Sequence, residues 1–319
     1  MGRQLADVGE FGLIDRITRH VHRAARAGPD RGVALGIGDD AAILRLRPGE
    51  ALAVSTDASV EDVHFSWKID APRSLGRRIL AAALSDLAAM GARPVGCTLA
   101  LAAPPALELR LLDGVLGGLV AEAAQRGCPL SGGNIARASE TSFSLTVLGA
   151  VAPQRALRRG QARRGDGLCV TGVLGRAALA RARAEATGRW NQDVPPDRLG
   201  VGRQMVRSGI RMACIDLSDG LSADLQHLLG ASGGLGAEVD LSAVPCGRGF
   251  RQACARYGLE PDATLASGGE DYELLFSVPP EHADPTKWSK RLGVRVSRIG
   301  QVVSSPGVRG LESGGWRHF

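Results

Sequence analysis

Acidic residues beside glycines or at the ends of predicted strands are the part of this sequence best suited to chemistry. They occur in five short segments: GDD at 38–40, STD at 55–57, LSD at 84–86, DLSDG at 216–220 and GGED at 268–271. Magnesium prefers oxygen ligands, and proteins usually hold it with a few carboxylates together with water and substrate phosphates. The pattern therefore predicts a metal–nucleotide site, in which metal ions offset the repulsion between carboxylates and phosphates.

Each acidic segment also has a structural explanation. Asp40 could belong to a turn, and Asp57 could cap the short strand that precedes it. Ser218 or Asp219 could be the N-cap of a helix. Asp86 is more informative, because it interrupts an apolar helix, where an ionised carboxylate is unfavourable unless it is paired or bound to a metal. The joint occurrence of the segments supports a ligand role more strongly than any single segment does.

Several familiar catalytic motifs are missing from the sequence. There is no GxxxxGK[ST] phosphate loop, no HExxH metal helix and no GxSxG nucleophile elbow. The string GIGDDA at 36–41 has the form of a dinucleotide fingerprint, but its two aspartates would repel a pyrophosphate that carries no metal. No residue set indicates a covalent intermediate, so we expect direct in-line transfer.

Alternating helices and strands must position the acidic segments. The spacing of apolar residues predicts helices, which cover 10–26, 74–90, 108–126, an alanine-rich stretch after 175, and 222–229. Apolar or alternating runs predict strands, which cover 51–54, 95–102, 143–151, 168–171, 213–215 and 237–241. This order is typical of the α/β or α+β class. A basic, turn-rich segment places a domain boundary between residues 1–152 and residues 153–319.

Composition and charge make several classes of protein unsuitable. Hydrophobic residues make up 44% of the chain and charged residues 23%, which is ordinary for a globular protein. The net charge of +6 is nearly all arginine, but no basic run is interleaved with aromatic residues, so we expect no nucleic-acid partner. No apolar run could span a membrane and no secretory signal is present, so we expect a cytoplasmic location. The six scattered cysteines are expected to be reduced thiols.

Taken in order, these segments resemble the thiamine-monophosphate kinase family, part of the ATP-binding superfamily that includes aminoimidazole ribonucleotide synthetase. The matching strings are GEFGLIDRI, GIGDDAAIL, STDASVEDVHF, LSDLAAMGARP, SGGN, LCVTGVLG, IDLSDGLSADL, SGGEDYEL and WRHF. The resemblance implies ATP-dependent phosphorylation of thiamine monophosphate to thiamine diphosphate with several magnesium ions. It also implies two α/β domains, the C-terminal one completing the active-site cleft, and a homodimer formed through the strands of the N-terminal domain.

The resemblance further implies roles for single residues. Metal ligands are expected at Asp40, Ser55, Thr56, Asp57, Asp86, Asn134, Asp216 and Asp219. Contacts to ATP are expected at Gly132, Gly133, Arg159 and Ser218. Contacts to the thiamine substrate are expected at His64, Glu270 and Trp316. A carboxylate and an aromatic ring suit the cationic, planar thiamine ring. Without the resemblance, Trp316 would be interpreted as a packing anchor and His64 as a structural residue.

Two positions depart from the family pattern. The family usually has GGD where this chain has GGN at 132–134. Asn134 can offer a carbonyl oxygen but no negative charge, so one ion should bind more weakly. Asp62 stands where glycine is common, which should stiffen the loop beside His64.

Two other functions stay open on the sequence. One is an ATP-dependent enzyme of the same superfamily that acts on another acceptor. A selenophosphate synthetase is disfavoured within that group, because the first lysine is Lys68 and the first cysteine is Cys97. The other is a nucleotide-binding protein with reduced catalysis, which only Asn134 motivates.

Overall fold

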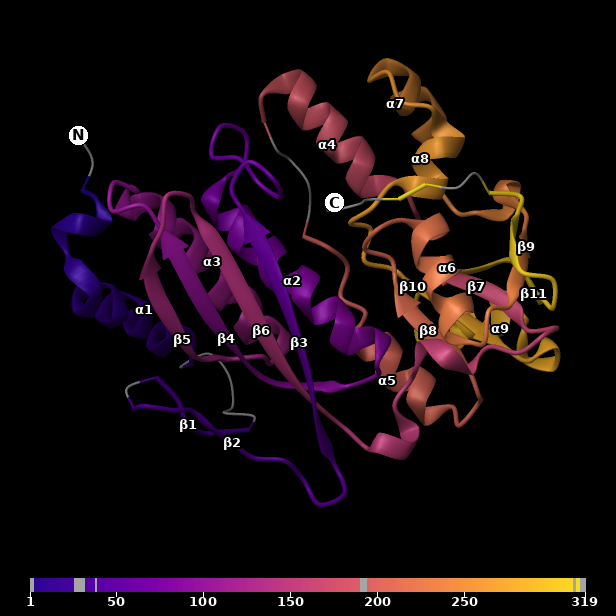
Figure 1. Cartoon of the computed structure of the whole chain (residues 1–319), viewed down its shortest axis with the longest axis horizontal. Helices are drawn as coiled ribbons and strands as arrows, with labels where there is room; N and C mark the ends of the chain where they lie inside the picture. Colours follow the sequence, from indigo (N-terminus) through magenta and orange to yellow (C-terminus); the bar gives the residue numbers. More distant parts are fainter. Residues whose placement is uncertain (1–2, 26–31, 38, 190–193, 312–313, 316–319) are drawn as a thin grey trace. The chain divides into compact units, whose positions relative to one another are not determined.

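The computed structural model describes residues 3–25, 32–37, 39–189, 194–311 and 314–315 (Figure 1). The chain divides into two compact units. Unit 1 comprises Met1–Leu87 and Arg93–Pro153, and unit 2 comprises Ala88–Ala92 and Gln154–Phe319. Each unit contains its own β-sheet together with helices. The predicted mixed α/β class is confirmed.

Unit 1 is built on a four-stranded mixed sheet. Its strands, in spatial order, are β3 (Ala51–Val60), β6 (Ser142–Val151), β4 (Arg93–Ala103) and β5 (Leu130–Arg137). The pairs β3–β6 and β6–β4 are antiparallel, and the pair β4–β5 is parallel. A separate two-stranded ribbon is formed by β1 (Val33–Leu35) and β2 (Ile43–Leu44).

One face of the unit 1 sheet carries the core. Along β6, Phe143, Leu145 and Val147 are fully buried, while the residues between them are half-buried. Side chains alternate between the two faces of a strand, so these three residues mark the inner face. Figure 1 shows helices behind the sheet. They are α1 (Gly9–Ala25), α2 (Pro72–Ala89) and α3 (Leu109–Arg126).

Helices α2 and α3 pack with their backbones in close contact. A Cβ atom added to Gly76 of α2 would lie 1.9 Å from the carbonyl oxygen of Val115 in α3. A Cβ atom added to Gly118 of α3 would lie 2.0 Å from the carbonyl oxygen of Arg73 in α2. Only glycine fits at these two positions, and the contact fixes the position of α2, which carries Asp86.

Unit 2 is built on a six-stranded sheet. Its strands, in spatial order, are β12 (Gly307–Arg309), β9 (Gly236–Val239), β11 (Val296–Val303), β7 (Gly167–Thr171), β10 (Leu274–Val278) and β8 (Ala213–Asp216). All neighbouring pairs are antiparallel except β12–β9. The α-helices are α4 (Arg176–Thr187), α5 (Leu199–Arg207), α6 (Leu221–Ala231), α7 (Phe250–Arg256), α8 (Pro261–Ser267) and α9 (Pro285–Leu292).

Short 3₁₀ helices complete the described elements. They are η1 (Leu5–Asp7), η2 (Pro153–Arg155), η3 (Arg159–Gln161), η4 (Leu241–Ala243) and η5 (Pro280–His282). The strand predicted at 237–241 ends two residues early, because the Asp240 side chain accepts a hydrogen bond from the Ser242 amide at 2.9 Å and starts η4. All six cysteines are free thiols, as predicted.

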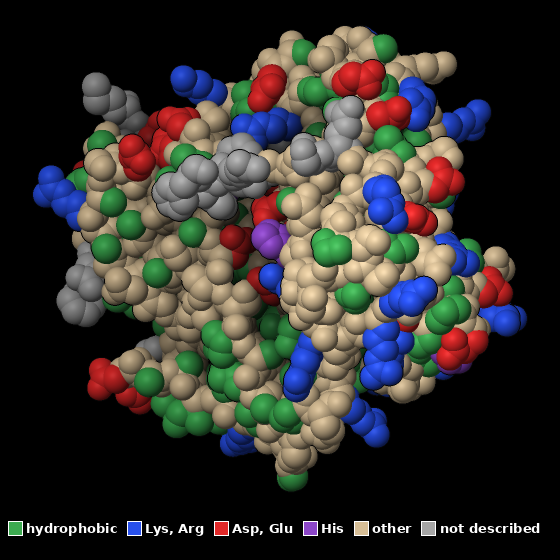
Figure 2. All heavy atoms as spheres, turned by 45° about the vertical axis from the view of Figure 1, so that its right-hand side comes forward, with side chains coloured by type: hydrophobic (Ala, Val, Ile, Leu, Met, Phe, Trp, Pro, Cys, Tyr) green, Lys and Arg blue, Asp and Glu red, His purple; other side chains and the backbone are tan. Residues whose placement is uncertain are grey.

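The surface gives no sign of a single basic patch on the face seen in Figure 2. There, lysine and arginine side chains are interspersed with acidic ones. Within the described residues, none of the helices combines the length and the apolar composition needed to cross a bilayer. The cytoplasmic location stays a prediction.

The contact between α2 and α3 leads to a stability prediction. Gly76→Ala should destabilise the protein by about 1–3 kcal/mol, because the added methyl group forces two helix backbones apart. Gly200→Ala in α5 is the matched control, since its Cβ would meet no atom within 4 Å and alanine favours a helix. Thermal unfolding should show a lower midpoint for Gly76→Ala only. Equal midpoints for the two variants would contradict the close packing.

Candidate functional site

Three of the candidate metal ligands share the inner face of the unit 1 sheet. Ser55 and Asp57 are two residues apart in β3, so their side chains point to the same face. Asp86 reaches this face from α2, and its Oδ2 atom accepts a hydrogen bond from the Ser55 hydroxyl. The structure therefore brings Ser55 and Asp86 together and places Asp57 beside them, half-buried. The half-buried Asp86 carboxylate is paired inside the apolar helix, as its position requires.

The strand that carries Ser55 and Asp57 is longer than the sequence indicated. The strand predicted at 51–54 was expected to end before Ser55, and this is wrong. β3 runs to Val60 and pairs with β6 along its whole length, with Asp57 opposite Leu145. A capping role for Asp57 is thereby excluded, because the residue lies in the middle of a ladder. A carboxylate at such a position favours a ligand role over a turn.

Thr56 and Asn134 lie on the other face of the same sheet. Thr56 stands between Ser55 and Asp57 in β3, so its side chain points to the opposite face from theirs. Its hydroxyl oxygen lies 2.7 Å from that of Thr146 in β6. Asn134 of β5 is exposed and pairs with Ala100 of β4, and Ala100 in turn pairs with Ser144 of β6. Three strand spacings separate β3 from β5, about 14 Å. Within unit 1, the Asn134 side chain is not brought to Asp57.

The two glycines before Asn134 differ in what they contact. A Cβ atom on Gly133 would lie 2.0 Å from the carbonyl oxygen of Leu99, so glycine is needed there for β4 and β5 to pair. A Cβ atom on Gly132 would make only an ordinary contact with Thr98, at 3.5 Å. Gly133 therefore has a structural reason besides the predicted ATP contact. Gly132 is the better candidate for a position kept open for a ligand.

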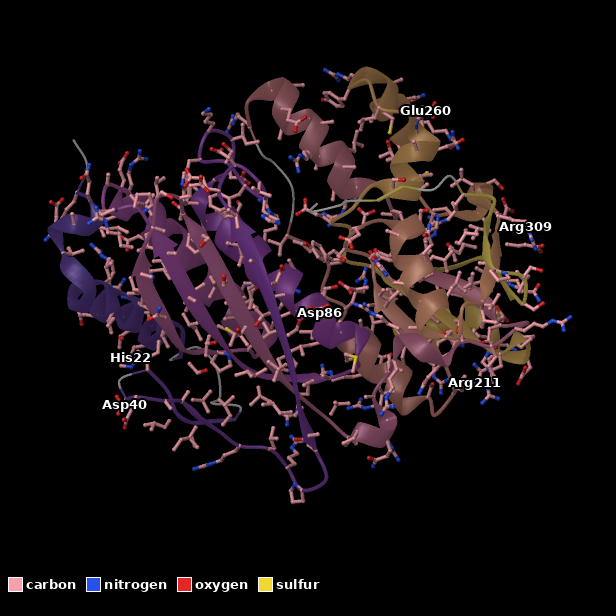
Figure 3. All side chains as sticks on the ribbon, viewed as in Figure 1. His22, Asp40, Asp86, Arg211, Glu260 and Arg309 are labelled. Atoms are coloured by element: carbon pink, nitrogen blue, oxygen red, sulfur yellow. The ribbon has the colours of Figure 1, made fainter. Side chains whose placement is uncertain are left out.

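Asp40 and His64 occupy loops of unit 1. Asp40 is exposed, and its amide donates a hydrogen bond of 2.8 Å to the Asp39 carboxylate, which is a turn contact. Figure 3 shows Asp40 well apart from Asp86. His64 is half-buried, and its Nδ1 accepts a hydrogen bond of 3.2 Å from the Val60 amide. The loop also contains Asp62, whose φ of +58° favours glycine and agrees with the departure seen in the sequence.

In unit 2, three carboxylates gather where β8 leads into α6. Asp216 ends β8 and is buried, and Asp219 follows it half-buried. Asp224 of α6 is also buried, and its Oδ2 accepts hydrogen bonds of 3.1 Å from the amides of Asp219 and Gly220. Burial, with the charges of Asp216 and Asp219 adding to it, raises the pKa of Asp224 to about 7. A cation held here would relieve this repulsion.

Asp224 was missed by the sequence analysis. Its signal is the same as that of Asp86, a carboxylate within an apolar helical stretch. The side-chain capping roles considered for Ser218 and Asp219 are wrong, because Gly220 is the N-cap of α6 and has no side chain. A Cβ atom there would lie 2.8 Å from the Ser267 backbone, and the φ of Gly220 is +114°. The DLSDG segment is thus a loop fixed by Asp224 rather than a helix cap.

Backbone hydrogen bonds hold the second acidic segment of unit 2 against the first. The Glu270 amide donates to the Ser218 carbonyl oxygen, and the Tyr272 amide donates to that of Leu217, both at 2.8 Å. The structure therefore brings Glu270 together with Ser218 and the neighbouring Asp219. Glu270 has a φ of +63°, a left-handed conformation that is strained for a glutamate.

Arg159 and Trp316 are the remaining candidates. The Arg159 carbonyl oxygen accepts a hydrogen bond of 2.9 Å from Ser232, which follows the C-terminal end of α6. The backbone of Arg159 is therefore about 16 Å, the length of the 11-residue helix, from the loop at the N-terminal end of α6. Trp316 lies outside the described residues. Gly315 before it is described, and its Cβ would lie 2.5 Å from that of Ala223 in the first turn of α6.

Taken together, the candidates form two groups, one in each unit. The first contains Ser55, Asp57 and Asp86, and the second contains the DLSDG loop and Glu270. Among the described residues, no three His, Cys, Asp or Glu side chains come close enough to form a ready metal site. The predicted ligands also include hydroxyl and amide side chains, whose oxygens would suit magnesium with substrate and water as further ligands.

Comparison with known proteins gives matches along nearly the whole chain. Residues 38–151 match the N-terminal domain of AIR synthase related proteins, and residues 163–311 match their C-terminal domain. Thiamine-monophosphate kinase of Synechococcus elongatus is 34% identical, covering 96% of this chain and 92% of the relative. That of Escherichia coli K12 is 37% identical, covering 95% and 92%.

Solved structures agree with these relatives. Thiamine-monophosphate kinase from Stenotrophomonas maltophilia K279a superposes with a TM-score of 0.80 at 35% identity, covering 95% of this chain and 98% of that one. AaThiL complexed with AMPPCP and TMP superposes with a TM-score of 0.72 at 28% identity, covering 98% of both chains. The resemblance inferred from the sequence motifs is confirmed.

Asp271 ends the GGED segment singled out in the sequence, and it has a structural role that the sequence did not predict. Its buried carboxylate accepts hydrogen bonds from the amides of Gly175, at 2.6 Å, and Ala177, at 3.0 Å, and so caps α4. Burial raises the pKa of Asp271 to about 6. Because this value is above the 3.8 of an exposed aspartate, the folded chain binds more protons than the unfolded chain between about pH 4 and pH 6.

The raised pKa gives a prediction with a definite sign. The raised pKa of Asp271 contributes to the free energy of unfolding. This contribution is fully present at low pH and is lost as the pH rises through about 6. Asp271→Asn removes the titration, so the substitution should cost about 2 kcal/mol more at pH 4.5 than at pH 7.5. Urea unfolding of both proteins at the two pH values measures this difference. A penalty that is larger at pH 7.5 would contradict it.

Proposed function

Because this chain belongs to the thiamine-monophosphate kinase family, we propose that it transfers the γ-phosphoryl group of ATP to thiamine monophosphate and makes thiamine diphosphate. The observation that carries this proposal is the match to named kinases over more than 90% of both chains. A related structure holds AMPPCP, an analogue of ATP, together with TMP. The acidic segments that predict a metal–nucleotide site are the segments shared with this family.

We further propose that magnesium is the metal of the reaction. The two groups of oxygen ligands fit this ion. Ser55, Asp57 and Asp86 form one group. In the other, burial raises the pKa of Asp224 and the charges of Asp216 and Asp219 add to the rise, so a cation held by these carboxylates would be stabilised. Bound magnesium would neutralise negative charge on the phosphates during transfer.

The chain's own residues would bind and orient the two substrates. Ser218 and Gly132 are proposed to contact ATP, as are Gly133 and Arg159. The Glu270 carboxylate is proposed to hold the cationic thiamine ring, with His64 and Trp316 as further contacts. No side chain is proposed as a nucleophile, so a phosphate oxygen of thiamine monophosphate attacks the γ-phosphorus directly. Binding in the correct orientation is then the main catalytic contribution of the protein.

The apolar outer face of the unit 1 sheet supports a homodimer. Leu52 and Val54 alternate with Ser55 and Asp57 along β3, and they are 46% and 58% exposed. Ile43 of the β1–β2 ribbon is 55% exposed. Exposed apolar side chains on the sheet and the ribbon of one unit indicate an interaction surface. We propose that two copies of the chain pair through this face.

The activity can be tested with two substitutions that should act in opposite directions. Purified protein should make thiamine diphosphate from ATP, magnesium and thiamine monophosphate, as followed by chromatography of the products. Asp57→Asn should lower turnover by at least about a hundredfold, because a charged metal ligand is lost. Asn134→Asp should lower the magnesium concentration needed for half-maximal activity, because it adds a negative charge to the oxygen ligand proposed for a separate ion on the outer face of the sheet.

The controls separate loss of function from loss of fold. Circular dichroism and thermal unfolding should be the same for both variants and the wild type. A wild type that turns over no thiamine monophosphate but releases ADP with another acceptor would overturn the substrate. Unchanged turnover in Asp57→Asn would remove this residue from the metal site.

The dimer is tested separately. Val54→Lys should convert the protein to a monomer at micromolar concentration, because a charge cannot be buried unpaired in an apolar interface. Val63→Lys is the matched control, since Val63 is 44% exposed but lies in a loop beyond β3. Sedimentation velocity distinguishes the two states. A dimer that survives Val54→Lys, or a monomeric wild type, would contradict the proposal.

A further inference from the structure

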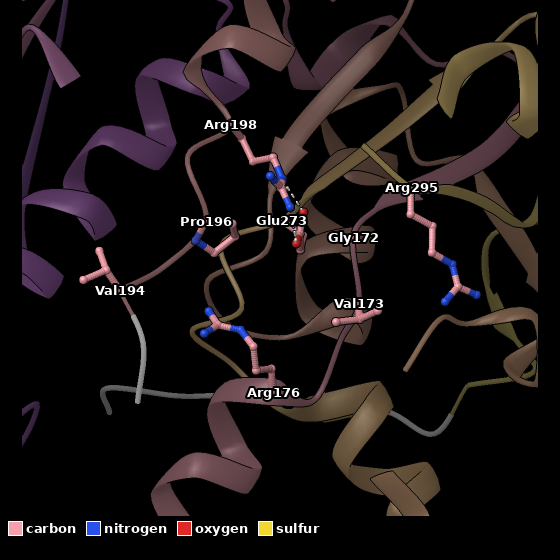
Figure 4. A pocket seen from close by; sticks show the side chains of 8 residues that line it. All are labelled: Gly172, Val173, Arg176, Val194, Pro196, Arg198, Glu273 and Arg295. Atoms are coloured by element: carbon pink, nitrogen blue, oxygen red, sulfur yellow. Dashed lines mark hydrogen bonds and ion pairs between the residues drawn. The ribbon is translucent and has the colours of Figure 1, made fainter. Parts of the chain in front are cut away.

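Unit 2 contains a pocket that includes none of the residues proposed to bind metal, ATP or thiamine. Its volume is about 300 Å³. The walls come from the β7–α4 connection at Gly172 and Val173, from residues 194–198 before α5, and from Arg295 before β11 (Figure 4). Three arginines and one glutamate line it. The charge of these four groups decides what it can bind.

The glutamate is already neutralised. Both oxygens of Glu273 accept hydrogen bonds from the Arg198 guanidinium, at 2.6 and 2.7 Å, and Thr171 adds a third bond of 2.6 Å. Such a forked pair is strong and geometrically fixed. Gly172 allows it, because a Cβ atom there would lie 1.8 Å from the Glu273 carboxylate. Arg198 and Glu273 therefore form a rigid wall without net charge.

The other two arginines give the pocket lining a charge of +2, which the buried Asp271 beside Arg176 offsets in part. Arg176 is the first residue of α4, and its Nη2 atom is buried without a hydrogen-bond partner among the described residues. A buried donor of this kind is unfavourable until it meets an acceptor. Arg295 is exposed. Figure 4 shows the two guanidinium groups on opposite sides of Val173, and dashed lines join only Arg198 to Glu273.

The rest of the lining is apolar. Val173, Val194 and Pro196 supply side chains without hydrogen-bonding groups. An inorganic ion would leave this surface without a partner, whereas the carbon skeleton of an organic molecule would cover it. The lining thus combines one buried donor, a positive charge at the exposed end, and an apolar wall.

We propose that this pocket binds a small organic anion, whose phosphate or carboxylate group pairs with Arg176 and whose apolar body lies along Val173, Val194 and Pro196. Arg295 attracts the ligand through its charge without closing over it. The inference does not depend on the kinase reaction, since none of these residues is assigned a part in it.

Calorimetric titration of the full-length protein with three compounds of similar shape tests the ligand class. The buffer contains EDTA, so that magnesium cannot bring phosphates to the carboxylates of the kinase site. Phenyl phosphate and benzoate should bind, and the neutral benzamide should not. Whichever anion binds more tightly identifies the anionic group. Benzamide binding as tightly as the anions, or no binding by either anion, would overturn the proposal.

Variants test the assigned residues. Arg176→Ala should weaken anion binding by at least about tenfold, the effect of losing one hydrogen bond to a charged group. Arg176→Lys keeps the charge and should lose less. Arg183→Ala, at an exposed position of the same helix, is the matched control and should bind like the wild type. Unchanged affinity in Arg176→Ala, or equal losses in Arg176→Ala and Arg183→Ala, would overturn the assignment.

The role of Arg295 has its own signature. Arg295→Ala should weaken binding severalfold at low ionic strength and have little effect in about 1 M salt, because exposed charges are screened. The Arg176→Ala effect should persist at high salt, since the buried donor is not screened in this way. The same salt dependence for both variants would contradict the division of roles between the two arginines.

Circular dichroism of Arg176→Lys guards against a folding defect, because this variant keeps a long cationic side chain.

Discussion

The carboxylate of Glu273 is buried at the start of β10, and the arrangement of unit 2 depends on how it is held. Arg198 and Thr171 saturate its two oxygens, while its own carbonyl oxygen accepts the Leu217 amide at 2.8 Å. An unpaired carboxylate at this depth would be strongly destabilising. The pairing therefore compensates the buried charge at the point where the chain meets the loop after β8. Backbone hydrogen bonds from Glu270 and Tyr272 then hold residues 270–273 against the DLSDG segment.

The carboxylates in the two groups of candidate ligands are compensated in different ways. In unit 1 the Asp86 carboxylate is half-buried and receives a hydroxyl hydrogen bond from Ser55, so a neutral donor compensates it. In unit 2 the Asp224 carboxylate accepts hydrogen bonds from two backbone amides. Burial, with the charges of Asp216 and Asp219 adding to it, still raises its pKa to about 7. In the second group, a bound cation would relieve the part of this rise that comes from the neighbouring charges.

Helices α1, α2, α3, α4 and α6, the fold class and the family were predictable because they depend on local periodicity and on contiguous motifs. The helices α5, α7, α8 and α9 were not predicted. Which side chains share a face of the sheet was not predictable, because the strand predicted at 51–54 ended before Ser55. The prediction therefore assigned no face to the residues that follow. Because β3 extends to Val60, its side chains alternate between the two faces of the sheet, and Thr56 and Asp57 point to opposite faces. Asp224 and the capping role of Asp271 were missed for a different reason. Their partners are backbone amides brought together by folding, and Asp271 lies 94 positions from Ala177 in sequence.

The alternation along β3 also changes the meaning of Asn134. Asn134 shares the outer face with Thr56, Leu52 and Val54, whereas Asp57 faces the helices with Ser55. The neutral side chain therefore leaves the charge of the Asp57 and Asp86 group unchanged. Its effect belongs to the face where the apolar residues of β3 are exposed. A change at Asn134 and a change at Asp57 thus probe physically separate surfaces of one sheet, and a protein altered at the first retains the ligands of the second.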